Sequence, residues 1–198
     1  MKDIKKVAVF AFDGTIIRGR TLPFFLRFAC DNLLVYAMNV LRSVPYVVLY
    51  NFRLLSKEAR LCHVMHTFLS GKSRGEIAEI ATDFVIHLNS RIDGKALQEL
   101  QAKRLDGYDI VIVSDSLKEV IAPWATRYGV KDIVANELEY DKDGICTGCL
   151  SAISCTDNDM LSRLNSECVG IEGAQVVAVS RRKRLPLFEQ IASVYCLV

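Results

Sequence analysis

The chain has 198 residues, of which 25 are basic and 23 acidic for a formal net charge of +2, and 51% of it is hydrophobic. This length suits one domain of ordinary size with a small insertion, and the apolar content excludes a disordered chain. Because the charges nearly balance, a nucleic-acid-binding module, which normally carries a strong basic excess, is not expected.

The first predicted element is a strand. Residues 6–12 form a continuous apolar run ended by Asp13-Gly14, which is typical of a buried parallel strand. Residues 21–93 then show the spacing of helices almost throughout. Within them we expect a first helix from residue 21 to a break near residues 43–45, followed by a second apolar segment.

Two further helices are predicted by their end signals. Ser56 is a suitable N-cap for a third helix, which Gly71 closes. Ser73 and Glu76 have the spacing of a capping box and predict a fourth helix over residues 75–90.

Residues 33–50, LLVYAMNVLRSVPYVVLY, are nearly long enough to cross a bilayer, but Asn39, Arg42 and Pro45 interrupt them. A buried or membrane-surface helical pair is therefore favoured over a membrane span. The default expectation is the packed core of a helical insertion, so contact with a membrane surface is possible but not favoured. The apolar residues expected in that core are Phe24, Phe25, Phe28, Leu33 and Leu34.

After residue 93 helices and strands alternate, which implies a parallel sheet with right-handed crossovers. We therefore predict an α/β, Rossmann-like core formed by residues 1–16 and 94–198, with residues 17–93 inserted as a helical cap. Helices are expected over 94–106, 116–128, 157–167 and 185–192, strands over 108–113, 132–135, 175–179 and 195–198, and a hairpin over 137–150 turning at 141–144.

Ligands of such sheets bind at the carboxyl ends of the strands. This rule selects three segments that follow buried strands, namely residues 11–15, 114–116 and 180–184. They are expected to meet in one crevice.

The cysteines suggest the compartment. There are seven, an odd number, and the charged segment 1–6 leads directly into the first strand without a secretory leader. Free thiols in a reducing cytoplasm are therefore expected. Cys146 and Cys149 form a single CxxC, which is weak evidence for zinc without a second pair, so ordinary thiols are favoured there. Trp124 is expected to be a packing residue.

Three stretches carry a resemblance to a known family. VFAFDGTI resembles motif I of the haloacid dehalogenase (HAD) superfamily, VIVSDS resembles motif II, and LPLF resembles the tail of motif IV. Their order and the place of the helical insertion are similar to the branch of phosphoserine-phosphatase-like and phosphatidylglycerophosphatase-like enzymes. The resemblance covers nearly the whole chain.

The resemblance implies a phosphatase with a covalent mechanism. In such enzymes one Asp attacks phosphorus and a second Asp, two residues on, serves as general acid and base. Mg²⁺ and a motif III Lys offset the negative charge, because a carboxylate that approaches a phosphate dianion is otherwise repelled.

Several of these positions are replaced here. The acid/base position is Asp13 and the phosphate-binding hydroxyl is Ser114, whereas the nucleophile position is Ala11. The motif III Lys would fall at or beside Met160. The two acidic positions of motif IV are Ser180 and Arg184. No metal ligand set is therefore expected, although an intact family member would bind Mg²⁺.

These replacements predict a catalytically degenerate phosphatase whose cleft binds a small phosphorylated molecule or a protein partner. Asp13 would then be a vestigial acid/base. The alternative is an active phosphomonoesterase, acting on a phosphoserine-like or lipid-phosphate-like substrate through residues that the motifs do not reveal. The sequence leaves open whether the chain is an enzyme.

Two further charged sites have open interpretations. Arg181 begins the most basic run, residues 181–184, which is either a solvated loop or, with Ser114, an anion site; a nucleic-acid patch is disfavoured. Asp115 is expected to face solvent or begin the following helix, because inside the cleft it would repel a phosphate.

Exposure of the apolar residues of the insertion would suit a lipid-like ligand, as the resemblance allows.

Overall fold

The apolar runs of the sequence form the strands of one sheet in the computed structural model, which describes residues 5–30, 32–167, 171, 173–181, 186–192 and 194–198. The strand order is β4-β3-β2-β1-β5-β6. Neighbouring strands are parallel, except that β3 and β4 pair as an antiparallel hairpin. The strands are β1 (Lys6–Ala11), β2 (Asp109–Leu117), β3 (Asp132–Tyr140), β4 (Cys146–Ala152), β5 (Gln175–Ser180) and β6 (Val194–Leu197).

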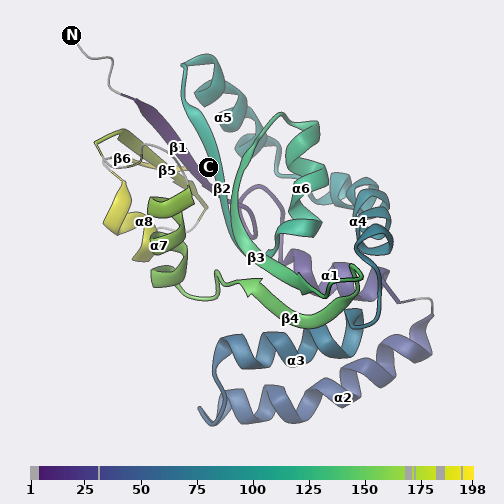
Figure 1. The fold of residues 1–198 in the computed structure, drawn as a ribbon. Helices are drawn as coiled ribbons and strands as arrows, with labels where there is room; N and C mark the ends of the chain where they lie inside the picture. Colours follow the sequence, from purple (N-terminus) through teal and green to yellow (C-terminus); the bar gives the residue numbers. More distant parts are fainter. Residues whose placement is uncertain (1–4, 31, 168–170, 172, 182–185, 193) are drawn as a thin grey trace.

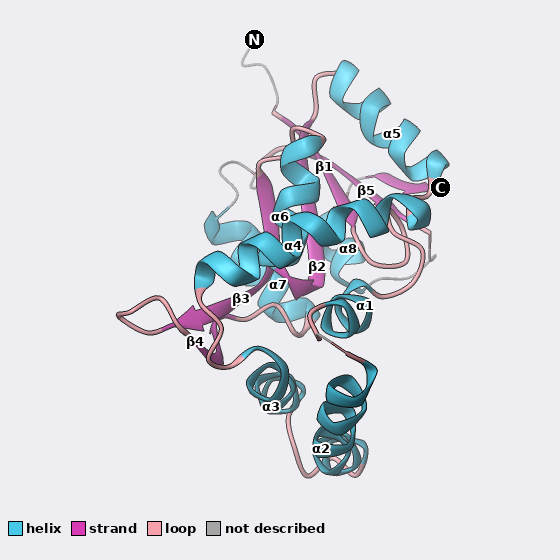
Figure 2. Ribbon diagram, turned by 90° about the vertical axis from the view of Figure 1, so that its right-hand side faces the viewer, coloured by secondary structure: helices cyan, strands magenta, loops and turns pink. Residues whose placement is uncertain are grey.

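Helices cover both faces of this sheet (Figures 1 and 2). On one face Phe10 and Phe12 lie in a core with Trp124, whose ring centroid is 5.2 Å from that of Phe12. On the other, Val9 and Val113 share a smaller core with Phe188. The helices are α1 (Thr21–Phe28), α2 (Leu33–Asn51), α3 (Lys57–Leu69), α4 (Arg74–Leu88), a 3₁₀ turn (Asn89–Arg91), α5 (Gly94–Leu105), α6 (Lys118–Arg127), α7 (Asp157–Glu167) and α8 (Pro186–Ile191).

The predicted α/β fold is therefore confirmed, and so is Trp124 as a packing residue, with no exposed surface. The helices α1–α4 connect β1 to β2, as expected of an insertion. Of these, α4 packs against α6 beside the sheet and α3 packs on its edge strand β4, while α2 lies beyond α3 and away from the sheet (Figure 1). That residues 17–93 form a separate cap stays a prediction.

The predicted N-caps of α3 and α4 are confirmed, whereas α4 ends at Leu88 rather than at residue 90. The Ser56 side chain accepts a hydrogen bond from the amide of Ala59 at 3.0 Å. The Ser73 hydroxyl accepts from the amide of Glu76, whose carboxylate accepts from the amide of Ser73 in return. Each pair satisfies amides that the first helical turn leaves without a partner.

The helix α3 lies directly on β4. The α3 residue His66 contacts the carbonyl of Thr147 through Nδ1 at 3.1 Å. Gly148 makes this approach possible, because a Cβ placed there would lie 2.3 Å from the Cα of His66. Its φ of +83° is also one that side chains rarely adopt. The packing of α3 on the hairpin thus depends on one glycine.

The predicted break near residues 43–45 is wrong. The helix α2 continues through Pro45, and the interruption lies before it, where the Asn32 side chain accepts from the amide of Val35 at 2.9 Å. A proline removes one amide donor, which would have bonded to the carbonyl of Leu41. Because Leu41 is exposed, water can satisfy that carbonyl, so the helix tolerates the proline.

The expectation that the apolar residues of the insertion form a packed core is mostly wrong. Phe25 is fully buried, but Leu33 and Leu34 are 63% and 77% exposed, and Phe24 and Phe28 are also exposed. The reason lies in the arrangement of the helices. The helix α2 is the outermost one and packs mainly on α3 (Figure 2), so only a narrow stripe of it is covered.

Two strands run further than predicted. β2 continues to Leu117, so α6 begins at Lys118 rather than at residue 116. The extension is held by Asn136 of β3, which pairs with Leu117 and donates its side-chain amide to the carbonyl of Asp115 at 2.7 Å. Similarly, β3 is continuous to Tyr140. The predicted hairpin turn is confirmed by hydrogen bonds from the amides of residues 143 and 145 to the Asp141 side chain.

Candidate functional site

A cavity of about 840 Å³ opens at the carboxyl ends of β1, β2 and β5. The three segments that the strand-end rule selected meet there, as predicted, except that residues 182–184 lie outside the described part of the chain. The prediction for Arg184 therefore lies outside it too. The sequence-predicted site residues that line the cavity, called the cleft below, are Ala11, Asp13, Ser114, Met160, Ser180 and Arg181.

Asp13 and Ser114 are in direct contact in the cleft. The Ser114 hydroxyl donates to Oδ2 of Asp13 at 2.6 Å, and the amide of Thr21 donates to Oδ1 at 2.5 Å. Ser114 also accepts from the amide of Ser116 at 3.0 Å. Burial raises the pKa of Asp13, and the hydrogen bonds from Ser114 and Thr21 oppose that rise only in part. Both carboxylate oxygens of Asp13 are thus engaged within the protein.

The nucleophile position is part of an apolar wall. Ala11 ends β1 and is 7% exposed, and its methyl group belongs to one apolar cluster with Met160 of α7 and Leu187 of α8. All three residues line the cleft. The nucleophile position and the residue at or beside which the family resemblance would place a lysine therefore carry uncharged, apolar side chains.

Lys57 is a cleft residue that the sequence did not reveal. It is the first residue of α3, and its ammonium group donates to Oδ2 of Asp115 at 3.0 Å and to the carbonyl of Cys155 at 2.6 Å. Arg20 donates to the same Asp115 oxygen at 3.2 Å. No local sequence signal marks Lys57, because its partners lie far along the chain.

The prediction that Asp115 faces solvent or begins a helix is wrong. Its side chain is 26% exposed, it lies within β2, and it lines the cleft. Burial alone would raise the pKa of Asp115, but the charges of Lys57 and Arg20 outweigh burial and lower it. The repulsion expected between this carboxylate and an anion is thus offset by two cations.

Arg181 is held at the rim by a carboxylate. Its guanidinium group and that of Arg18 both donate to Oδ2 of Asp93, at 2.5 and 3.3 Å, and its amide donates to Thr15 at 3.2 Å. Asp93 is 3% exposed and also caps α5. Burial would raise the pKa of Asp93, but its hydrogen bond from Ala96 and the two arginines lower it. Arg181 therefore has a structural partner, and its contact with a ligand stays a prediction.

The family resemblance implies Mg²⁺, which prefers a near-octahedral set of oxygen ligands. The donors at the described part of the cleft do not fit it. Ala11 has no side-chain oxygen, and both carboxylate oxygens of Asp13 already accept hydrogen bonds. Across the described residues there is no group of three or more His, Cys, Asp or Glu side chains suited to a metal. Cys146 and Cys149 are free thiols.

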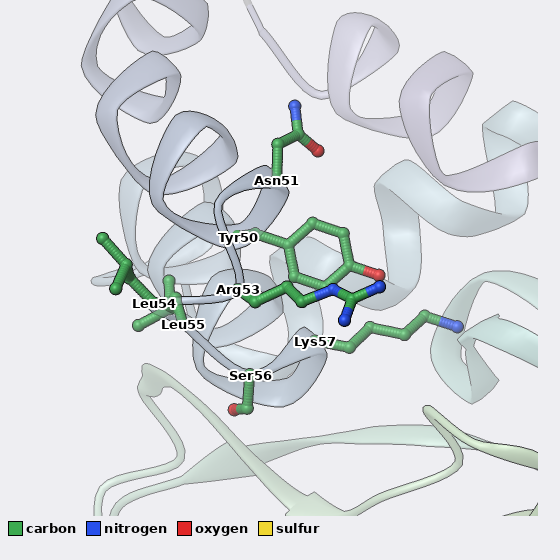
Figure 3. A pocket seen from close by; sticks show the side chains of 7 residues that line it. All are labelled: Tyr50, Asn51, Arg53, Leu54, Leu55, Ser56 and Lys57. Atoms are coloured by element: carbon green, nitrogen blue, oxygen red, sulfur yellow. The ribbon is translucent and has the colours of Figure 1, made fainter.

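A second cavity, of about 600 Å³, lies at the loop between α2 and α3. Figure 3 shows Arg53 and Lys57 extending toward one side of this loop while Leu54 and Leu55 lie on the other. Arg53 has a φ of +59°, in the left-handed region. Lys57 lines both cavities, so this residue joins the α2–α3 loop to the cleft.

Solved structures with a similar fold agree with this architecture. A protein of unknown function from Bordetella pertussis Tohama I has a TM-score of 0.78 at 18% identity, covering 98% of this chain and 90% of that one. A phosphoserine phosphohydrolase-like protein from Francisella tularensis subsp. tularensis SCHU S4 has a TM-score of 0.63 at 18% identity, covering 96% and 85%. A substrate-bound phosphoserine phosphatase complex has a TM-score of 0.61 at 17% identity, covering 98% and 94%.

No sequence among curated proteins matches the chain significantly. The sequence model of the haloacid dehalogenase-like hydrolases, however, matches residues 8–180, which extend from within β1 to the end of β5. Motif I, motif II and the place of the helical insertion lie within that match. The chain therefore belongs to the haloacid dehalogenase-like hydrolase family.

Proposed function

We propose that the chain is a catalytically degenerate phosphatase whose cleft binds a small phosphorylated molecule without transferring the phosphoryl group. The observation that carries this proposal is the apolar wall formed by Ala11, Met160 and Leu187 at the end of β1. A covalent transfer needs an electron pair at this wall, and a methyl group supplies none.

Asp13 is poorly placed to replace the missing nucleophile. Both of its oxygens accept hydrogen bonds, from Ser114 and from the amide of Thr21. Attack would require at least one of these bonds to break, and the Met160 side chain does not supply the positive charge that the approach to a dianion needs. Burial raises the pKa of Asp13, and the hydrogen bond from Ser114 keeps its carboxyl group on the side of β2.

The basic side chains of the cleft suit an anion that competes with their carboxylate partners Asp115 and Asp93. Among the described residues four basic and three acidic side chains line it, and two of the basic groups converge on the single carboxylate of Asp115. Arginine and lysine both bind phosphate well, through forked and single-point hydrogen bonds respectively. Because a neighbour with the same fold is a substrate-bound phosphoserine phosphatase complex, phosphoserine is the first ligand to test. The four basic side chains that line the cleft are Arg18, Arg20, Lys57 and Arg181, and the three acidic ones are Asp13, Asp115 and Asp157.

A calorimetric titration tests the binding. We expect the protein to bind phosphoserine in the absence of added metal and not to bind serine. Lys57→Met should weaken binding by about tenfold, because one charge-assisted hydrogen bond is lost. Lys118→Met is the matched control, since Lys118 makes an ion pair of 2.9 Å with Glu137 and does not line the cleft. Equal affinity of the wild type and Lys57→Met would contradict the proposed site.

A turnover assay tests the missing chemistry. With an aryl phosphate and Mg²⁺ we expect no hydrolysis by the wild type and none by Ala11→Asp. In the variant Met160 would still lack the positive charge of a lysine, and Ser180 would still lack the carboxylate that binds the metal. Tight binding of Mg²⁺ at one site, measured in a separate titration, would contradict the inference that the residues of the cleft do not form a magnesium site.

The alternative is an active phosphomonoesterase, and the Asp13–Ser114 contact favours it. A carboxyl group with a raised pKa, 2.6 Å from a hydroxyl, has the character of a general acid and base. Hydrolysis by the wild type that disappears in Asp13→Ala would establish this alternative and refute the degenerate phosphatase.

A further inference from the structure

The helix α2 has the composition of a membrane helix and very little contact with the protein. Leu33–Asn51 spans 19 residues, and its most apolar 18-residue window has a mean hydropathy of 1.4 with only 11% of that window buried. Length and composition alone do not separate a membrane helix from the core helix of a soluble protein. Its low burial does exclude a core helix.

The side of α2 that faces the protein is its polar side. Between residues 33 and 50, the only side chains that are not exposed are spaced alternately three and four residues apart. They lie along α3: Tyr46 stacks on His63 at 3.9 Å, and Arg60 lies over the ring of Tyr50 at 4.1 Å. Each of the five carries a polar group, and they are Tyr36, Asn39, Ser43, Tyr46 and Tyr50.

Apart from Arg42 and Asn51, the side chains on the rest of the helix surface are apolar. At 100° per residue the polar stripe occupies roughly 80° of the circumference, which leaves roughly 280° for the exposed side chains. On that arc Leu34 and Leu41 are 77% and 72% exposed. Arg42 is the only charged residue of α2. This is the reverse of a surface helix of a water-soluble protein, which buries its apolar stripe.

The width of this arc distinguishes a protein partner from lipid. A second helix would cover only a narrow seam of apolar residues, and a protein core would cover a stripe of roughly 100°. An arc of roughly 280° matches neither, whereas lipid chains can contact a helix from all sides that the protein leaves free.

The charges around the helix indicate the charge of the lipid headgroups that it would contact. No acidic residue occurs from Leu33 to Leu55, while Arg42 and Arg53 are both exposed in that segment. Beside it, Phe52 and Leu54 at the α2–α3 loop are each 73% exposed. Basic residues next to exposed apolar ones favour a surface of anionic headgroups over hydrocarbon.

We propose that α2 lies in the interface of an anionic lipid bilayer, with α3 on its water side. A membrane span is disfavoured by α3, which packs along the polar stripe and carries Lys57, Glu58 and Arg60 at its start. A span would draw those charges into the hydrocarbon layer. The proposal does not depend on what the cleft binds.

Vesicle co-sedimentation tests the proposal. The full chain should bind vesicles of equal parts phosphatidylglycerol and phosphatidylcholine, and bind more weakly as salt is added. The double variant L34E/L41E should bind more than about tenfold more weakly, because two charges would enter the apolar layer. Both positions are exposed, so its circular dichroism and melting temperature in water should equal those of the wild type.

Two further variants separate apolar contact from charge. L105E is the matched control, because Leu105 at the end of α5 is 88% exposed but lies outside α2; it should keep the wild-type affinity. R42Q should bind the mixed vesicles about fivefold more weakly, as expected for one arginine near an anionic surface, with no such loss on pure phosphatidylcholine.

Three outcomes would overturn the proposal. Binding by L34E/L41E equal to that of the wild type would show that α2 is not the contact. If the wild type did not bind vesicles but formed a dimer, and the double variant L34E/L41E were monomeric, the exposed face of α2 would be a contact between two copies of the chain. Resistance of bound protein to alkaline carbonate extraction would indicate a span rather than an interfacial helix. None of these assays involves ligand binding in the cleft, so their failure leaves the proposed function unaffected.

Discussion

The neighbouring helices α2 and α3 bury opposite kinds of side chain. The helix α3 buries Leu61 and Met65 and exposes polar residues such as Glu58, whereas α2 buries Asn39 and Ser43 and exposes leucines and valines. The two helices pack on each other, so the contrast is not one of location within the fold. It shows that the polarity of a helix must be compared with its burial before its surroundings can be inferred. On that comparison α3 belongs to the core and α2 does not.

The largest expected effect comes from the place where α3 rests on the hairpin. Gly148→Ala should lower the free energy of unfolding by about 3 to 5 kcal/mol, because overpacking against His66 adds to the strain of a positive φ. Gly144→Ala, at a φ of +76° with nothing within 4 Å of the added Cβ, should lower it by only about 1 kcal/mol. Urea denaturation measures both, and equal losses would mean that the contact with α3 is unimportant.

Truncation of one side chain on each helix tests the contrast directly. Met65→Ala on α3 removes a fully buried side chain and should lower the free energy of unfolding by about 3 kcal/mol. Leu41→Ala on α2 removes a side chain that is 72% exposed and should change it by less than about 0.5 kcal/mol. A comparable loss at both positions, measured by denaturation in water, would show that α2 is part of the core after all.

The N-caps of the two helices sharpen the comparison further. Ser56→Ala removes the cap of α3 and should lower the free energy of unfolding by about 1 kcal/mol. Asn32→Ala removes the equivalent bond of α2. It should instead accelerate amide hydrogen exchange in the first turn of α2 while global stability changes by less than about 0.5 kcal/mol. Matching global losses would indicate that α2 unfolds together with the rest of the chain.

The smallest expected effect concerns an acidic first turn, which α4 has and α2 lacks. Hydrogen bonds from Ser73 lower the pKa of Glu76 below its usual 4.5. The unfolded chain therefore binds the proton more tightly, so the stabilisation is fully present above pH 4.5 and is lost as the pH falls through the lower, folded pKa. The melting temperature of the wild type should exceed that of Glu76→Gln at neutral pH and converge with it in acid. If the difference in melting temperature between the wild type and Glu76→Gln increased as the pH fell, the hydrogen bonds of Ser73 would not stabilise the ionised form of Glu76.

Much of the sheet was predictable because its signals are local. Apolar runs such as residues 6–12 define buried strands, and the rule that ligands bind at strand ends is enough to predict that Asp13 and Ser114 lie in one crevice. The lengths of β2 and β3 were not predictable in the same way, since Asn136 extends the pairing through a contact between strands. Pairing partners decide where a strand ends.

Two failures have a common cause. Helical spacing says which residues share a face, but it does not say whether anything covers that face, so Leu33 and Leu34 were wrongly assigned to a core. Lys57 was missed for the same reason, because only the tertiary path of the chain brings the start of α3 to Asp115. The replacement of a nucleophile by Ala11, in contrast, is visible in the sequence itself.

The ion pairs of Asp115 have a consequence for ligand exchange. This carboxylate of the sheet holds Lys57 and Arg20, which both belong to the segment between β1 and β2. Within the cleft, the segment between β1 and β2 is therefore joined to the sheet by two ion pairs as well as by the packed core. The ion pairs weaken as ionic strength rises and are open to competition from any anion that enters. A phosphorylated ligand of the kind proposed above would compete with Asp115 for Lys57 and Arg20, so its binding would weaken these two ion pairs.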